Sequence, residues 1–135
     1  MIGGSDFYFD ECVLGAAKIL RREFSFDVLH PGHPSVPDLP LGAPDTAWMP
    51  VVAGRDLIAV TRDLRLKRRS SERIVWREHG LRVVLLGSRE DLRPRDEVDI
   101  FLKHLDRIQR YAVKEGRGPW GLSVTRASAR PLKVT

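Results

Sequence analysis

Acidic residues follow two apolar segments of the chain, at positions suited to metal-ion chemistry. Asp10 and Glu11 directly follow the segment 7–9, and Asp63 comes after the segment 58–61. Short apolar runs rich in aromatic or β-branched residues are typical of buried strands. Because ligands of parallel α/β sheets bind beyond the carboxyl ends of the strands, two such strands would place their acids at one edge. A strand that simply ends at the surface is the competing explanation for Asp10 and Glu11.

Asp45 lies between these two segments in the sequence and is a third candidate. Carboxylates that crowd into one cleft repel one another unless a cation balances their charge. Ligand sets made only of oxygen suit Mg²⁺ or Mn²⁺, and such an ion can activate a water and stabilise a phosphodiester under attack. Asp10, Asp45 and Asp63 are therefore candidates for one oxygen-rich site, with Glu11 as a fourth. Asp45 is also well placed to cap a helix.

Basic residues crowd directly after the second apolar segment. The chain carries 23 Lys and Arg against 18 Asp and Glu, a formal net charge of +5. The basic residues after the second segment are Arg62, Arg65, Lys67, Arg68, Arg69 and Arg73. Such a run indicates contact with a polyanion such as nucleic acid, or else a solvated face.

The remaining metal-binding and nucleophilic residue types form no competing pattern. His30 and His33 have a spacing unsuited to a helical metal pair. Cys12 is the single cysteine, which excludes an internal disulfide and a cysteine metal cluster. We expect Cys12 to be a small buried hydrophobe. The sequence also lacks a glycine-rich phosphate-binding loop of either familiar pattern.

The elements that must position these residues alternate between strand and helix. Apolar periodicity and turn residues predict strands over 7–9, 27–30, 57–61 and 82–87, and an edge strand or docked extension over 120–124. They also predict helices over 13–23, 46–53, 70–79 and 96–115, with Gly80 ending the third of these. Residues 30–45 contain five of the nine prolines and predict a long loop. This alternation is typical of an α/β fold with a mostly parallel sheet.

Length and composition suit one compact domain. The 135 residues predict a single domain over residues 1–125, followed by a basic, flexible tail over residues 126–135. No apolar run approaches the roughly 18 residues that a membrane span needs. The first residues lack the pattern of a signal peptide. We therefore expect a cytoplasmic protein without a membrane partner.

Three short motifs of this sequence resemble those of the PIN-like domains. They are Phe9-Asp10-Glu11 after the first strand, the helix start over residues 45–48, and the segment 58–63, which ends in a Thr-x-Asp pattern. The resemblance covers about residues 6–90. It implies a three-layer α/β fold in which helices flank a mostly parallel sheet of four to five strands.

The resemblance also implies an activity, because PIN-like domains include the metal-dependent ribonucleases found as VapC-type toxins. It implies that Asp10, Asp45 and Asp63 bind Mg²⁺ or Mn²⁺, that Glu11 is an adjacent acid, and that Thr61 orients Asp63 or a bound water. RNA would be the substrate, and a small antitoxin would be the partner. Homodimers are common in the family.

The sequence departs from the family pattern in two places. A further acid that many members carry shortly after the Thr-x-Asp pattern is missing, and Glu72 is the nearest replacement. The proline-rich loop is longer than the usual connection. Our first hypothesis is a metal-dependent endoribonuclease that acts as a toxin. The alternative is a catalytically weak module that binds RNA or a partner protein. A receiver-like signalling domain is disfavoured because no strand ending in lysine follows the strand 82–87.

Overall fold

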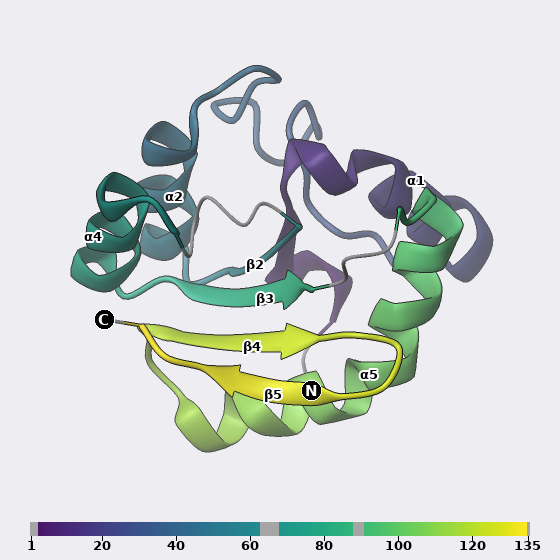
Figure 1. Cartoon of the computed structure of the whole chain (residues 1–135). Helices are drawn as coiled ribbons and strands as arrows, with labels where there is room; N and C mark the ends of the chain where they lie inside the picture. The colour runs from purple at the N-terminus through teal and green to yellow at the C-terminus, as the bar shows by residue number, and fades with distance from the viewer. Residues whose placement is uncertain (1–2, 63–67, 88–90, 135) are drawn as a thin grey trace.

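The computed structural model describes residues 3–62, 68–87 and 91–134. They form three layers, in which a central sheet lies between two pairs of helices (Figure 1). Five strands follow one another across the sheet in the order of the sequence, and the first four are parallel. The strands are β1 Phe7–Phe9, β2 Ile58–Thr61, β3 Arg82–Leu86, β4 Trp120–Val124 and β5 Ala129–Leu132. The α/β class predicted from the sequence is confirmed.

On one face of the sheet, helix α1 (Leu14–Phe24) packs against helix α5 (Pro94–Glu115). The alternation of a strand turns Phe7 and Phe9 toward these helices, where both lie in one core cluster with Phe101 of α5. The ring of Phe101 meets Phe7 and Phe9 edge to face, at centroid distances of 5.2 and 5.1 Å. These contacts fix the position of β1, and so of the acid that follows it.

The opposite face carries helix α2 (Asp45–Gly54) and helix α4 (Ser70–His79), which pack against each other. Tyr8 points to this side, because it alternates with its neighbours in β1, and its ring lies 5.4 Å from that of Trp48. Gly80 ends α4 in a left-handed conformation with φ of 67°, as the sequence predicts for a helix-terminating glycine. Pro50 stands inside α2.

The proline-rich segment contains neither helix nor strand over residues 31–44, in agreement with the predicted loop. Its buried residues Val36 and Leu39 pack into the same core cluster as Tyr8 and Trp48. The predicted strand over 27–30 is reduced to a single parallel bridge between Leu29 and Tyr8. The loop is therefore held against the side of the sheet that α2 and α4 cover.

Several local expectations are wrong. Pro44 occupies the position before α2, so Asp45 is the first helical residue and not its cap. Likewise, α5 begins at Pro94, and Asp96 accepts a hydrogen bond from the Arg93 N–H at 2.9 Å within the first turn. β4 is an inner strand and not an edge strand, because the segment we expected to be a flexible tail contributes β5 beside it.

Candidate active site

Asp10 stands at the carboxyl end of β1 and opens the short 3₁₀ helix η2 (Glu11–Val13). Its backbone N–H donates to the Val60 carbonyl at 3.0 Å, which continues the pairing between β1 and β2. Only 6% of Asp10 is exposed. Buried carboxylates are rare unless hydrogen bonds or a metal ion stabilise their charge. The surroundings of this side chain therefore determine what it can do.

Three donors hold the Asp10 carboxylate. The Glu11 N–H donates to Oδ1 at 2.6 Å, and the Thr61 hydroxyl donates to Oδ2 at 2.9 Å. The Cys12 thiol donates to the same Oδ2 at 3.3 Å. Because a carboxylate offers about four lone-pair sites, Oδ1 keeps a site for a further partner. The arrangement fixes the orientation of Asp10 while leaving part of it available to a ligand.

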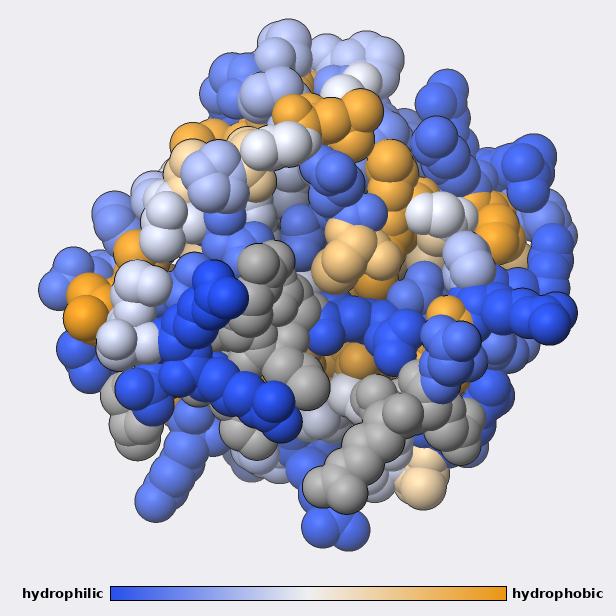
Figure 2. All heavy atoms as spheres, turned by 45° about the horizontal axis from the view of Figure 1, so that its top comes forward, coloured by the Kyte–Doolittle hydropathy of each residue, from blue (hydrophilic) through white to orange (hydrophobic). Residues whose placement is uncertain are grey.

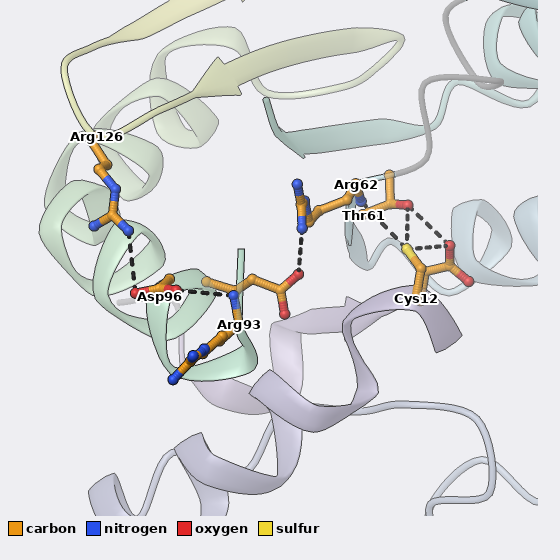
Figure 3. Close-up of polar contacts among 8 residues, drawn as sticks. Cys12, Thr61, Arg62, Arg93, Asp96 and Arg126 are labelled. Atoms are coloured by element: carbon orange, nitrogen blue, oxygen red, sulfur yellow. Dashed lines mark hydrogen bonds and ion pairs between the residues drawn. The ribbon is translucent and has the colours of Figure 1, made fainter. Parts of the chain in front are cut away.

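Cys12 is exposed as a residue, so our expectation of a buried hydrophobe is wrong. Figure 3 shows its sulfur turned toward Thr61, which comes from the end of β2. Burial of the thiol raises the pKa of Cys12 to about 12, and the charge of Asp10 adds to this effect. The thiol therefore stays protonated near neutral pH, where it serves as a hydrogen-bond donor and not as a thiolate ligand.

The other two predicted acids in the described part of the chain lie in separate hydrogen bonds. Glu11 is exposed, and its Oε1 accepts from the Gly42 N–H of the proline-rich loop at 2.6 Å. Asp45 accepts from the indole N–H of Trp48 at 3.0 Å. Among residues 3–62, 68–87 and 91–134, no three His, Cys, Asp or Glu residues come together to hold a metal ion.

Glu97 is a buried acid near this edge that the sequence analysis missed. It lies in the first turn of α5, is 4% exposed, and contacts Arg62 with 3.5 Å between Oε2 and Nη1. Burial raises the pKa of Glu97, and the positive charge of Arg62 opposes that rise. Arg62 points from the end of β2 toward α5 in Figure 3. The sequence contains a signal for the burial of Glu97, because this residue precedes Phe101 by four positions and so lies on the same, buried side of the helix.

Comparison with known protein families agrees with this geometry. A family model described as a PIN-like domain matches residues 5–88. The chain belongs to the PIN-like domain family. Searches of curated proteins and of solved structures gave no match. PIN-like domains are commonly nucleases and generally use divalent metals, so the fold of this chain is of a nuclease type.

The donors of this PIN-like domain suit such an ion in their chemistry. Asp10 supplies a charged oxygen with a remaining lone pair, and oxygen donors are those that Mg²⁺ and Mn²⁺ prefer. Asp63, the third predicted ligand, lies outside the described residues. Glu72, the replacement acid suggested by the sequence, is buried and accepts from the Ser71 hydroxyl at 2.7 Å. The three-acid metal set thus stays a prediction.

The predicted RNA-binding residues of the PIN-like domain have different surroundings. Arg62 is paired with Glu97, while Arg68 and Arg69 are exposed just before α4. Arg73 is partly buried, and its Nε has no hydrogen-bond partner in the described structure. Arg65 and Lys67 lie outside the described residues. On the face in Figure 2, hydrophilic residues predominate and hydrophobic ones gather in a few separate areas.

Across the described ranges, none of the helices is long and apolar enough to cross a membrane. The longest, α5 (Pro94–Glu115), is amphipathic, with one side in the core and charged residues on the other. This composition suits a helix that covers a sheet.

Proposed function

We propose that this PIN-like domain is a Mg²⁺- or Mn²⁺-dependent endoribonuclease of the cytoplasm and acts as the toxin of a toxin–antitoxin pair. The observation that carries the proposal is Asp10, a buried carboxylate at the carboxyl edge of a parallel sheet in a family of nuclease type. Three hydrogen-bond donors offset the burial of its charge, and its Oδ1 keeps a lone pair that a cation can use. RNA suits the basic charge of the chain.

Each residue of the site has a defined task in this proposal. Asp10, Asp45 and Asp63 would hold the metal, with Glu11 beside them. When bound, the metal would lower the pKa of a water and stabilise the negative charge of the phosphodiester. Thr61 and the Glu11 N–H hold the Asp10 carboxylate in one orientation. Glu11 also holds the proline-rich loop near the site through Gly42.

RNA cleavage by the purified chain tests the proposal. We expect cleavage in Mg²⁺ or Mn²⁺, none in EDTA, and loss of cleavage in the Asp10→Asn variant, because the amide lacks the charge that attracts the ion. Asp99→Asn is the matched control, since it removes a carboxylate from an exposed position on α5. Thermal unfolding should show that both variants fold. Cleavage that survives in Asp10→Asn, or in EDTA, would refute the assignment.

The toxin role needs a separate measurement. Expression of the wild-type chain should arrest growth, and expression of Asp10→Asn should not. Co-expression of the antitoxin, which we propose to be a small protein, should restore growth. Cleavage in vitro without growth arrest would support the nuclease activity and refute the toxin role.

A second candidate is a catalytically weak module that binds RNA or a partner protein. The sequence favours it at one point, because the further acid that many family members carry shortly after the Thr-x-Asp pattern is missing. In that case the chain would bind RNA or a protein equally well in EDTA and in Mg²⁺, and no cleavage would follow in either.

A further inference from the structure

A basic recess lies on the surface beside α1. It has a volume of about 490 Å³ and is lined by Lys18, Arg21 and Arg22 of α1 and by His30. The lining contains no acidic side chain. The ammonium group of Lys18 and the guanidinium groups of Arg21 and Arg22 present donors and positive charge to whatever enters the recess.

The nearby acids neutralise little of this charge. Arg21 reaches Asp27 only at 3.9 Å, and both side chains are more than half exposed, at 64% and 57%. Arg22 contacts Glu23 at 3.4 Å, and the carboxylate of Glu23 is shared with Arg95, which donates to both of its oxygens. In the described part of the chain Lys18 has no ion-pair partner. Exposed ion pairs of this kind are weak, so the recess keeps most of its charge.

The two histidines beside the recess have different hydrogen bonds. His33 Nδ1 accepts from the Ser35 N–H at 3.0 Å, so its Nε2 carries the proton that faces Asp27 at 3.1 Å. His30 Nδ1 faces the Pro31 carbonyl at 2.9 Å and must therefore donate to it. In the neutral imidazole the Nε2 atom of His30 is then an acceptor, so the donors that face a phosphate in the recess are those of Lys18, Arg21 and Arg22.

The topology places the recess at one side of Asp10. Phe9 and Asp10 are consecutive, so their N–H groups point to opposite sides of β1, one to Leu29 and the other to Val60 of β2. Leu29 therefore borders β1 on the side away from β2, and its parallel bridge brings His30 out at the same edge of the sheet as Asp10. Two strand spacings, about 10 Å, separate Leu29 from β2.

The basic residues that follow β2 lie on the other side of this acid. Arg68 and Arg69 are exposed just before α4, while Arg62, directly after β2, is paired with Glu97. Asp10 thus stands between two basic regions, one beside α1 and one after β2. A single-stranded polyanion bound to both regions would cross the carboxyl edge of the sheet at Asp10.

We propose that the recess of Lys18, Arg21, Arg22 and His30 binds the phosphate backbone of single-stranded RNA and directs the strand across Asp10. This inference rests on the proposed function for the identity of the polyanion. Contacts of this kind are independent of sequence and hold the substrate in register. The recess would therefore set the minimum length of RNA that binds well and not the base at which it is cut.

Fluorescence anisotropy can test this proposal. It would measure the binding of labelled single-stranded RNAs of increasing length, in EDTA and at several salt concentrations. Lys18→Ala combined with Arg22→Ala should weaken the binding of the longer RNAs and leave the shortest unaffected. The slope of log K against log salt is negative, and each lost phosphate contact reduces its magnitude by about 0.7. The loss of two contacts should therefore reduce the magnitude by about 1.4. The charge-reversed pair Lys18→Glu and Arg22→Glu should weaken binding further.

Lys114→Ala combined with Lys133→Ala is the matched control. It removes the same charge from two exposed positions, at the end of α5 and after β5, where the sheet presents the opposite edge. We expect its salt slope to equal that of the wild type. A slope in the Lys18 and Arg22 variants that equals that of the control would overturn the proposal. Wild-type protein that binds no RNA, or that binds only an acidic peptide, would overturn it as well.

The two proposals fail in different ways. If RNA binding depends on Lys18 and Arg22 but no metal-dependent cleavage occurs, the proposed role of the recess is supported and the proposed nuclease activity is refuted. If cleavage requires Asp10 but the salt slope is unchanged in the recess variants, the proposed nuclease activity is supported and the proposed role of the recess is refuted.

Discussion

Thr61→Val removes the hydroxyl that donates to the candidate site, together with its 3.3 Å contact with the Cys12 sulfur. Thr61 is fully buried at the end of β2, and its hydroxyl donates to Asp10 Oδ2 at 2.9 Å. Valine keeps the shape and suits a strand, but it leaves Oδ2 with the weaker thiol donor Cys12. A hydrogen bond to a charged group contributes about 1.5–3 kcal/mol, so the free energy of unfolding should fall by about this amount.

The same substitution should affect activity. Residues that orient a metal ligand typically change metal affinity or activity by about 10- to 100-fold when they are removed. We expect Thr61→Val to need a higher Mg²⁺ concentration for half-maximal RNA cleavage.

Urea unfolding and single-turnover cleavage over a Mg²⁺ titration measure the two effects. Thr61→Ser is the control, because it keeps the hydroxyl and loses only a buried methyl group. The Thr61→Val and Asp10→Asn double mutant should show a smaller loss of stability than the sum of the single losses. If Thr61→Val matches Thr61→Ser in both assays, this hydrogen bond does not position Asp10 and the reasoning is refuted.

Two further predictions concern the surroundings of the site. Burial raises the pKa of Glu97 above the ordinary glutamate pKa of 4.5, so folding favours the protonated form of this side chain. The free energy of unfolding should therefore fall as the pH rises above 4.5. Urea unfolding of Glu97→Gln over that pH range should lack this decrease, and curves that run parallel for wild type and variant would contradict the assignment. Glu11→Ala removes the acceptor of the Gly42 N–H and should speed proteolysis within residues 30–45, whereas Glu11→Gln keeps an acceptor and should resist as the wild type does. Equal rates for the two Glu11 variants would show that this contact does not hold the loop.

Local patterns in the sequence predicted most of the helices and strands. The apolar period of α1 and the glycine after α4 depend only on neighbours in the chain, and both predictions are confirmed. The prediction that Asp45 caps α2 is wrong because Pro44, with φ of −66° and an extended backbone, occupies that position instead. Capping residues and first-turn acids look alike in a sequence, since both stand next to the start of a helix.

The contacts of the candidate site were harder to predict because they join distant parts of the chain. Thr61 meets Asp10 only because Phe9 pairs with Val60, and a strand register across some fifty residues leaves no local signal. We expected Thr61 to orient Asp63 or a bound water; Asp63 lies outside the described residues, and the structure shows the Thr61 hydroxyl donating to Asp10. Glu97 escaped notice for a related reason, since its partner Arg62 belongs to a different element. The order of elements along the chain nevertheless predicted that Asp10 follows a strand of the sheet, and the structure places it at the carboxyl end of β1.

The strand β5 has a consequence for how copies of the protein can associate. Two sheets with unpaired edge strands can pair edge to edge, so that one sheet continues from one molecule into the next. Here β5 forms the outer strand beside β4, and it contains Pro131, which has no N–H to donate, and the charged Arg130. At the other side, β1 is bordered by the single bridge to Leu29, after which the chain turns away at Pro31. Continuation of one sheet into another through β5 is therefore disfavoured, and we expect a homodimer of this chain to use surfaces other than this edge.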